Sequence, residues 1–371
     1  MKPIIKWPGG KSNEIKKIEH LIPKYDRYIE PFFGGGAVFF HLNPSKAIIN
    51  DISKSLIDYY KLVKNQDIQF HSLLLKYDKS FSTLLLACNE YYEEILKIYV
   101  KAQTLCAKSE IIEELSVLLK KILQYMNISI YVDLILNISE FFEQIIITVT
   151  DKIIRTVKLN QKKLLQKDDL RNNLITGFMS GYYMYFRRIY NDINLKKITN
   201  ISMAYKVANF YFVREYCYGS MFRYNNNGEF NIPYGGISYN KKIFKNKIDT
   251  MFNTETKQIF QNTEIYCLDF ADLFKQIKLT AKDFVFLDPP YDTNFSDYEN
   301  RQFDKSDQER LAHELRKMKA QFILVIKNTD FIKSLYEKDF NILSFDNTYT
   351  YNVRGRNKRD VEHLIITNMS I

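Results

Sequence analysis

The pattern of apolar and polar positions changes twice along the 371-residue chain. Near the amino terminus, short apolar runs alternate with glycine and proline. This predicts a strand over 27–30, a glycine-rich turn over 31–36, a helix from residue 37 and a second strand over 46–50. Asp51 follows that second strand directly. Strand, glycine turn, helix, strand and acid is the order of a nucleotide-binding βαβ unit, so this region predicts the start of an α/β domain.

From about residue 52 to residue 215, apolar residues recur at helical spacing. One such stripe consists of Ile111, Leu115, Leu118 and Ile122. It is typical of a helix that buries one face. Glycine is absent between residues 37 and 176, which also favours helices. We therefore predict a mostly helical block in the middle of the chain.

Residues 219–240 interrupt the helical pattern with glycine, asparagine and proline, and 229–233 is a candidate extended segment. After about residue 263 the α/β pattern returns. Further strands are predicted at 266–268, 284–287, 322–326 and 363–367. The α/β core is therefore predicted to be interrupted by the middle of the chain and completed at its end.

The strongest chemical signal is Asp288-Pro289-Pro290-Tyr291, which follows an entirely apolar predicted strand. That strand places the four residues at the carboxyl edge of the sheet, where α/β enzymes bind their ligands. The prolines stiffen the backbone and leave the Pro289 carbonyl without a helical hydrogen bond. Two oxygen acceptors and the flat ring of Tyr291 suit a grip on an exocyclic amino group of a base. The alternative is a tight turn capped by Asp288.

The glycine turn and Asp51 each have two interpretations. The run Phe32 to Gly36 either lets the backbone approach a bound nucleoside closely or is an ordinary turn before a helix. Asp51 either accepts hydrogen bonds from ribose hydroxyls or caps the helix that follows. The two features together favour the ligand-binding interpretation.

Composition and charge narrow the class of protein. Hydrophobic residues make up 46% and charged residues 26% of the chain, which excludes wholesale disorder. The 53 basic residues exceed the 43 acidic ones and give a formal charge of +10. This favours an anionic partner, with nucleic acid ahead of an acidic membrane.

Cysteine usage and hydropathy indicate the compartment. The four cysteines are scattered and include no Cys-x-x-Cys pair, which argues against a structural zinc site and suits a reducing environment. No apolar run reaches about 18 residues, and the amino terminus lacks the apolar core of a signal peptide. We expect a cytoplasmic protein that has no metal site and no membrane segment.

Taken together, the motifs resemble the Dam-type (alpha-group) family of DNA adenine N-6 methyltransferases, which use S-adenosylmethionine. The resemblance covers roughly 1–65 and 205–371, and the motifs occur in the order typical of the family. The matching segments are Lys6 to Lys11, Glu30 to Gly36, Asn50-Asp51, Arg223 to Asn225 with Gly228 to Gly235, and Asp288 to Tyr291.

The resemblance implies a fold and a division into domains. The fold is α/β: a Rossmann-like S-adenosylmethionine-dependent methyltransferase core with an inserted, mostly helical and hairpin target-recognition domain. Residues 1–60 and 251–371 would form the catalytic core, and 61–250 the helical insert and target-recognition region. The helices at about 80–180 exceed those of compact family members. They could bind DNA, bind a partner subunit or pack on the core.

The resemblance also implies cofactor-binding residues. They are Trp7, Lys11, Phe32, Gly34, Gly36, Asp51, Asp269, Phe270 and Asp288. Phe32, Gly34 and Gly36 resemble the loop that wraps the methionine portion of the cofactor, and Asp269 with Phe270 would flank its adenine. Without the resemblance, a sole tryptophan is usually a packing residue and a lone lysine a solvated charge.

The implied catalytic residues are Asp288, Pro289, Pro290 and Tyr291. The target adenine would be flipped out of the duplex and stacked on Tyr291. Asp288 and the Pro289 carbonyl would accept its two N–H bonds, so that the nitrogen lone pair points at the sulfonium methyl. The transfer would be direct, without a covalent enzyme intermediate. The segment 292–304 is either a mobile loop that closes over substrate or a plain surface loop.

Two segments are candidates for DNA contact. The turn at 223–228 resembles a hairpin that enters a groove, where Arg and Asn read guanine and adenine edges. The basic segment 353–359 resembles a phosphate clamp, and its alternative is a solvated surface. The DNA-binding candidates are Arg223, Asn225, Asn226, Asn227, Arg354, Arg356, Lys358 and Arg359.

The expected function is methylation of adenine in double-stranded DNA, with S-adenosylmethionine as donor. The alternatives are a catalytically inactive DNA-binding or assembly protein and an amino-methyltransferase that acts on RNA. A cognate restriction endonuclease that acts separately is a candidate partner, and no membrane partner is expected. The hairpin resembles that of GATC-type enzymes, which makes GATC a first guess for the site.

Overall fold

The computed structural model describes residues 1–8, 10–11, 14–104, 107–220, 223–290, 303–348 and 360–370. The chain forms two compact units. The first joins Met1–Asn65 to Asn253–Ile371, and the second is Gln66–Phe252. The roles that the sequence assigns to its predicted domains stay predictions.

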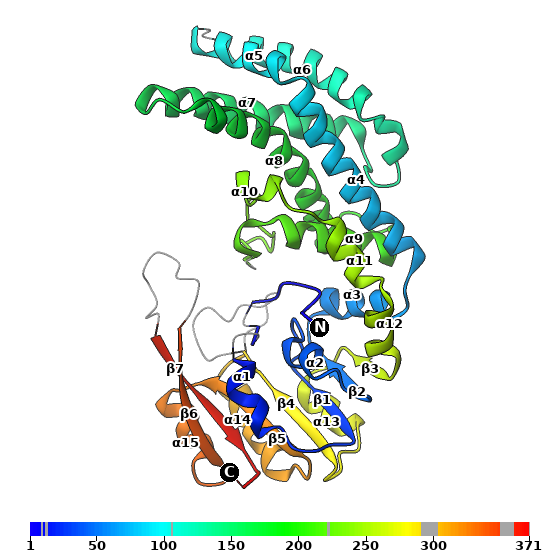
Figure 1. Cartoon of the computed structure of the whole chain (residues 1–371), viewed down its shortest axis with the longest axis vertical. Helices are drawn as coiled ribbons and strands as arrows, with labels where there is room; N and C mark the ends of the chain where they lie inside the picture. The colour runs from blue at the N-terminus through cyan, green and yellow to red at the C-terminus, as the bar shows by residue number, and fades with distance from the viewer. Residues whose placement is uncertain are drawn as a thin grey trace. The chain divides into compact units, whose positions relative to one another are not determined.

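Within the described residues, the first unit contains a seven-stranded sheet in the order β3-β2-β1-β4-β5-β7-β6 (Figure 1). The strands are β1 (Arg27–Glu30), β2 (Ala47–Asn50), β3 (Thr263–Tyr266), β4 (Asp283–Leu287), β5 (Gln321–Lys327), β6 (Asn341–Thr348) and β7 (Asp360–Thr367). Strands β3, β2, β1, β4 and β5 are parallel, and β7 is antiparallel to its neighbours β5 and β6. The entirely apolar runs of β4 and β5 are typical of central strands covered on both faces.

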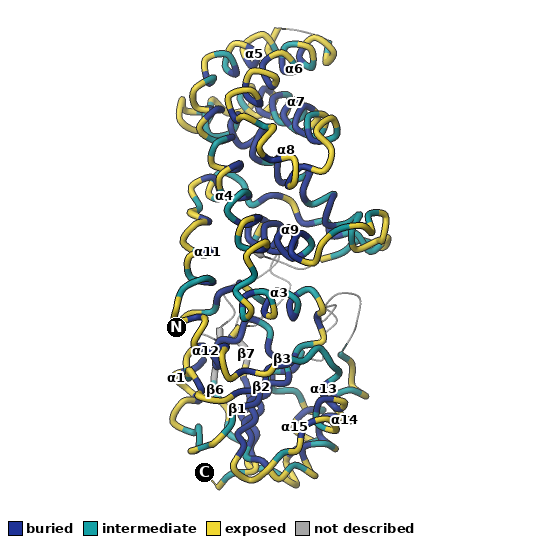
Figure 2. Tube along the Cα trace, turned by 90° about the vertical axis from the view of Figure 1, so that its right-hand side faces the viewer, coloured by how far each residue is buried: buried dark blue, intermediate teal, exposed yellow. Residues whose placement is uncertain are grey.

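Helices cover both faces of this sheet. They are α1 (Ile15–Ile18), α2 (Ala37–Leu42), α3 (Lys54–Lys64), α12 (Thr254–Gln261), α13 (Phe270–Gln276), α14 (Lys305–Lys317) and α15 (Asp330–Tyr336). Figure 2 shows α13, α14 and α15 on one side of the buried strands. On that side, Val285 and Leu287 of β4 share a core with Leu311 of α14. Phe284, the alternate residue of β4, packs on Tyr28, whose ring also contacts Phe39 of α2.

The second unit is helical. Its helices are α4 (Ile68–Glu90), α5 (Tyr92–Thr104), α6 (Lys108–Tyr125), α7 (Ile138–Lys162), α8 (Lys167–Asn194), α9 (Met203–Tyr216), α10 (Ile237–Asn240) and α11 (Lys245–Met251). Aromatic rings fill its core; Tyr77, for example, stacks on Phe212 with ring centroids 4.6 Å apart. Helices α7 and α8 approach closely at Gly181, where a Cβ would lie 2.8 Å from the Cα of Ile145. No helix within the described residues has the length and apolarity needed to cross a membrane.

Most of the predicted elements are confirmed. Strands β1, β2, β4, β5 and β7 lie within a few residues of their predicted bounds, and the predicted apolar stripe is buried along α6. The predicted strand at 266–268 is placed too late, because β3 ends at Tyr266 and the backbone of Leu268 bonds to the Asn50 side chain.

Two further elements differ from the expectation. Strand β6 was not predicted because it pairs only with β7 at the edge of the sheet, and its sequence mixes polar with apolar residues. The candidate extended segment at 229–233 contributes a single isolated bridge, Tyr224 to Phe230, and forms no strand.

Candidate active site

Four strands of the first unit bring the predicted site residues to one edge of the sheet. Strand β1 lies between β2 and β4, and β3 lies beside β2, all in parallel. Because parallel strands end at the same edge, the residues after each strand gather there. These are the glycine turn after β1, Asp51 after β2, Asp269 after β3 and Asp288 after β4.

The glycine turn has a backbone that favours glycine. Gly34 has a φ of +49° and Gly36 a φ of +67°, in the left-handed region. The N–H of Gly34 donates to Oδ2 of Asp51 at 2.8 Å, and its carbonyl accepts from the Tyr60 hydroxyl at 2.9 Å. The turn is therefore held on both sides of Gly34.

Trp7 packs directly on this turn. A Cβ at Gly34 would lie 2.9 Å from Cδ1 of Trp7, and a Cβ at Gly35 would lie 3.3 Å from its Cβ. Trp7 is only half-buried. The indole therefore lies against glycine backbone at the carboxyl edge of the sheet. The cofactor-binding role of Trp7 stays a prediction.

Asp51 binds backbone rather than capping a helix. Its Oδ1 accepts from the N–H of Ser53 at 2.9 Å, while Oδ2 holds Gly34. The side chain that caps α3 is Ser53, which accepts from the N–H of Leu56. Burial raises the pKa of Asp51, and the backbone donors oppose that rise. The capping alternative is thus wrong, and contact with a ribose stays a prediction.

Asn50 belongs to the matching segment Asn50-Asp51, but the sequence analysis gave it no role. Its amide nitrogen donates to the carbonyls of Pro31 and Leu268, at 2.9 and 3.0 Å, and its oxygen accepts from the N–H of Leu268 at 2.9 Å. One buried side chain therefore fixes the loops that follow β1 and β3. A polar residue at the end of the apolar run at 47–49 was the available signal.

An aromatic cluster lies beside Asp269. The ring of Phe32 contacts Phe270 and Phe303, with centroids 5.5 and 5.6 Å apart. Asp269 caps α13 by accepting from the N–H of Ala271. Arg310 of α14 donates to Asp269 at 2.6 Å and lies over the Phe270 ring. Arg310 was not predicted, and the adenine-flanking role of Asp269 and Phe270 stays a prediction.

Asp288 forms an ion pair with Lys11. The Lys11 Nζ lies 2.9 Å from Oδ1 of Asp288, and Lys11 is 3% exposed while the Asp288 side chain is 19% exposed. The alternative of a solvated Lys11 is therefore wrong. Burial raises the pKa of Asp288 to about 6, although Lys11 opposes that rise. A carboxylate with this pKa is ionised at neutral pH. The Asp288 side chain is also still partly accessible to solvent.

Two more buried groups interact with Asp288 or with the residues that follow it. Glu30 at the end of β1 accepts from the Tyr28 hydroxyl at 2.7 Å, and burial raises its pKa well above the usual range. Gln308 of α14 is fully buried and donates to the carbonyl of Pro290 at 3.0 Å. The backbone after β4 is therefore held from α14. Glu30 belongs to a segment that carries the family resemblance but was given no role of its own, and Gln308 was not singled out from the sequence.

The predicted hairpin of the second unit is a turn anchored on α8. Asn191 binds both the N–H and the carbonyl of Phe230, at 2.8 and 3.1 Å. The hydroxyl of Tyr183 donates to the Ile232 carbonyl at 2.9 Å. These contacts hold the segment on a rigid helix.

Within the turn, the candidate DNA-binding residues are not equivalent. The Asn225 side chain is engaged in the turn: its oxygen accepts from the N–H groups of Asn227 and Glu229. Arg223 is exposed and donates to Asn231 at 3.1 Å. The side chains of Asn226 and Asn227 are exposed. The structure thus separates a turn-forming asparagine from two exposed ones.

Some predicted residues lie outside the described part of the chain. They are Tyr291, the segment 292–302, Arg354, Arg356, Lys358 and Arg359. Their roles stay predictions.

Comparison with known proteins identifies the family. A model of the D12 class N6 adenine-specific DNA methyltransferases matches residues 7–129 and 142–351. The chain belongs to this family. The family that the motifs indicate is thereby confirmed, and the chain is an adenine-specific DNA methyltransferase.

Relatives of this methyltransferase carry consistent names. It is 27% identical to the type II methyltransferase M.MjaIII of Methanocaldococcus jannaschii, over 99% of both chains. It is 25% identical to the type II methyltransferase M.CviBI of Paramecium bursaria Chlorella virus NC1A, over 99% of this chain and 100% of the relative. It is 21% identical to a DNA adenine methylase of Serratia marcescens, over 95% and 94% of the two chains.

The edge of the sheet fits the methyl donor that a methyltransferase requires. A sulfonium donor is cationic and carries a nucleoside. The carboxylates of Asp51, Asp269 and Asp288 at this edge suit a cation, and the glycine turn with positive φ values lets the backbone approach a nucleoside. Among the described residues, no group of three His, Cys, Asp or Glu side chains is arranged to hold a metal ion.

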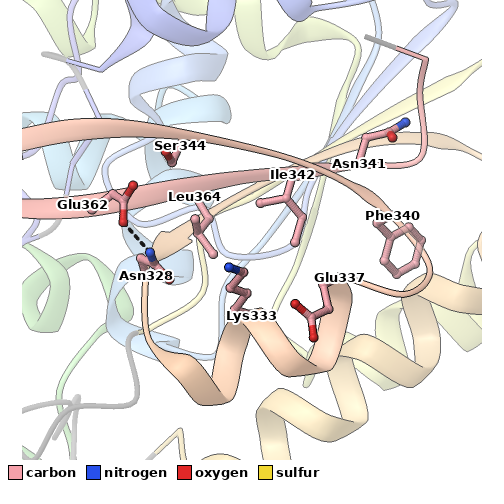
Figure 3. A pocket seen from close by; sticks show the side chains of 9 residues that line it. All are labelled: Asn328, Lys333, Glu337, Phe340, Asn341, Ile342, Ser344, Glu362 and Leu364. Atoms are coloured by element: carbon pink, nitrogen blue, oxygen red, sulfur yellow. Dashed lines mark hydrogen bonds between the residues drawn. The ribbon is translucent and has the colours of Figure 1, made fainter.

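A separate cleft of the methyltransferase contains none of the predicted site residues. It has a volume of about 440 Å³ and lies between α15 and strands β6 and β7 (Figure 3). Its lining residues are Asn328, Lys333, Glu337, Phe340, Asn341, Ile342, Ser344, Glu362 and Leu364. Asn328 donates to Glu362 at one end of the cleft. The cleft is therefore not the place where the site residues converge.

Proposed function

We propose that this methyltransferase transfers the methyl group of S-adenosylmethionine to the exocyclic nitrogen of an adenine that is flipped out of duplex DNA. The observation that carries the proposal is the convergence of the glycine turn, Asp51 and the Lys11–Asp288 pair at one edge of the sheet. Family membership supplies the reaction class, and the geometry suggests which residues perform it.

Asp288 is proposed to activate the target nitrogen as a hydrogen-bond acceptor. The lone pair of that nitrogen is delocalised into the adenine ring, so the nitrogen is a poor nucleophile. When Asp288 and the Pro289 carbonyl accept hydrogen bonds from its two N–H groups, the nitrogen becomes pyramidal. Its lone pair is then free to attack the methyl group. One hydrogen bond to a charged group contributes about 1.5–3 kcal/mol, which corresponds to roughly 10- to 150-fold in rate.

The remaining acceleration comes from positioning. Gln308 holds the Pro290 carbonyl and Lys11 holds the Asp288 carboxylate, so both ends of the acceptor segment are fixed before substrate binds. S-adenosylmethionine supplies an electrophilic methyl group. We assign its binding to Trp7, the turn from Phe32 to Gly36, and Asp51, with Asp269 and Phe270 at its adenine.

The second unit is proposed to recognise the DNA target. Its turn exposes Arg223, Asn226 and Asn227, whose side chains can bond to base edges or phosphates. The excess of basic residues in the chain favours association with the DNA backbone. Since relatives are named type II methyltransferases, we also propose a restriction endonuclease with the same target sequence as a separately acting partner.

The experiment is methyl transfer from isotopically labelled S-adenosylmethionine to duplex DNA, followed by nucleoside analysis. The proposal predicts label in N6-methyladenine, no transfer to RNA of the same sequence, and loss of label with Asp288→Ala. Label in RNA alone would support the RNA alternative. No label from a folded protein that binds DNA would support the inactive DNA-binding protein.

A further inference from the structure

Asp288 is the end of a row of four ionisable side chains drawn from three parts of the first unit. Lys11 lies 2.9 Å from Asp288, and Glu14 lies 3.9 Å from Lys11. His363 of β7 completes the row, with its Nδ1 3.3 Å from Oε2 of Glu14. Lys11, Glu14 and His363 are each less than a tenth exposed.

The backbone explains how this row is built. The N–H groups of Glu14 and Ile15 donate to the Lys11 carbonyl, at 2.8 and 3.1 Å. That turn puts the side chains of Lys11 and Glu14 side by side. His363 is fixed from both sides, because β7 pairs with β5 at Lys327 and with β6 at Phe345.

Because the row is buried, each of its charged groups depends on its partners in the row. Lys11 carries one positive charge, while Asp288 and Glu14 carry two negative charges when ionised. Removing an unbalanced charge from water costs several kcal/mol. His363 is the donor of its pair with Glu14, because its Nδ1 lies 3.3 Å from Oε2 of a carboxylate, which can only accept.

Other charged or titratable groups face Asp288 from β1. Glu30 and Tyr28 both interact electrostatically with it. On the far side of the row, the Phe345 ring of β6 packs against His363 and the ammonium group of Lys17 lies over that ring. Glu14 and His363 are the members of the row that change the pKa of Asp288 without bonding to it directly.

We propose that Glu14 and His363 are positioning residues for methyl transfer, which hold the Lys11 ammonium against the Asp288 carboxylate and set the charge that this carboxylate experiences. This proposal rests on the role of Asp288 given above. Glu14 gives Lys11 a second acceptor, which keeps the flexible lysine chain from leaving Asp288. His363 in turn fixes Glu14 and compensates its charge. Neither residue contacts the substrate in this account.

The test is the pH dependence of single-turnover methyl transfer at saturating S-adenosylmethionine and duplex DNA. Glu14→Gln keeps the shape of the side chain and removes a negative charge, so Asp288 ionises more easily. The acid limb of the profile, which is the part where the rate falls as the pH is lowered, should move to lower pH by about 0.5–1 unit in Glu14→Gln. His363→Asn keeps a donor near the Nδ1 position but removes the side chain whose electrostatic effect lowers the pKa of Asp288. Its acid limb should move to higher pH by a similar amount.

The opposite signs are the signature of the proposal, because a loss of stability alone would not move the two limbs in opposite directions. His363→Leu removes the donor as well, and its rate at pH 8 should fall about 10-fold below that of His363→Asn, with an unchanged KM for S-adenosylmethionine. Limbs that coincide with the wild type, or that move in the same direction, would overturn the proposal.

Thr367→Val is the matched control. Thr367 lies on the same strand and, four residues on, the same face as His363, and its buried hydroxyl donates to the Phe322 carbonyl at 2.6 Å. This variant should lower the unfolding temperature and leave the acid limb unchanged. If the wild type methylates DNA and Asp288→Ala does not, unmoved limbs in the row variants reject only the positioning role. If the wild type transfers no methyl group, both proposals fall.

Discussion

The two units bury polar groups in different ways. In the second unit, several buried polar side chains are neutral and bond to their own helix: Ser80, Thr150 and Thr176 each donate to a carbonyl four residues earlier. In the first unit, buried Lys11, Glu14, Glu30 and His363 gather around Asp288. A helical hydroxyl is satisfied locally at little cost, whereas a buried charge costs several kcal/mol unless it is paired. The arrangement in the second unit serves packing. We attribute the charged arrangement in the first unit to the proposed methyl transfer.

The second unit does contain one buried charge cluster, and it differs from the row at Asp288. Glu215 at the end of α9 pairs with Lys242 and Lys247, at 3.2 and 2.6 Å. These pairs join α9 to the segment that contains α10 and α11. Glu215 is 1% exposed at its side chain, whereas Asp288 keeps 19% of its side chain open to a substrate. The exposed fraction of the carboxylate therefore separates a structural ion pair from the pair that we propose to be catalytic.

The largest expected effect comes from breaking the charged arrangement around Asp288 in the first unit. Asp288→Ala removes the charged acceptor and leaves Lys11 with one carboxylate fewer, so the rate of methyl transfer should fall about 100-fold or more. Duplex affinity should change little. Ser80→Ala is the counterpart in the second unit: it removes a buried hydroxyl that bonds to Lys76 and contacts Tyr182, so it should lower stability by about 1 kcal/mol and leave the rate unchanged. Equal rates for the two variants would remove the distinction between the units.

The next effect concerns the glycine turn. Gly34→Ala places a methyl group 2.9 Å from the Trp7 indole at a φ of +49°, so it should raise the Kd for S-adenosylmethionine about 10-fold or more through backbone strain. Gly10→Ala is the control, because a Cβ there meets only the Trp7 carbonyl at 3.6 Å. Isothermal titration with the cofactor measures both. Similar affinities for the two variants would show that the turn does not hold the cofactor.

A similar effect is expected at the turn of the second unit, on DNA affinity instead of cofactor affinity. The double change of Asn226 and Asn227 to Ala should raise the Kd for target duplex about 10-fold, since one base contact contributes about 1–3 kcal/mol. Asn191→Ala removes only the anchor of the turn and should weaken the same binding. Fluorescence anisotropy with target and scrambled duplexes compares them. Unchanged affinity in both variants would assign recognition to another segment.

The smallest effect separates two neighbouring residues after β2. Ser53→Ala removes the cap of α3 and should cost about 1 kcal/mol of unfolding free energy without changing cofactor affinity. Asp51→Asn should instead weaken cofactor binding, because Asp51 holds Gly34. Urea unfolding and cofactor titration of both variants make the comparison. A cofactor defect in Ser53→Ala would show that the helix cap, and not the acid, orders the turn.

The sequence predicts the edge of the sheet better than the interior of the site. The order of strands and acids places Asp51, Asp269 and Asp288 at one edge, because parallel strands end together. Pairs that depend on tertiary contact could not be predicted: Glu14 and His363 are 349 positions apart and meet only because β7 folds back between β5 and β6. Glu14 begins a short helix, and His363 lies in an apolar strand, so neither has a local signal.

The turn at 223–231 shows a second limit of sequence reasoning. All three asparagines from 225 to 227 have the residue type that reads adenine edges. The structure assigns Asn225 to the turn itself, because its side-chain oxygen binds two backbone N–H groups. Which asparagine forms a turn depends on backbone geometry, and composition alone does not reveal it.

The most direct test of the central claim is the rate of single-turnover methyl transfer by the wild-type protein as a function of pH. Asp288 must be ionised to accept the amino hydrogens, and burial raises its pKa to about 6. The rate should therefore be constant above pH 7 and fall tenfold per unit well below pH 6. A rate that stays constant down to pH 4.5, in protein that remains folded there, would contradict the assignment of Asp288 as the activating group.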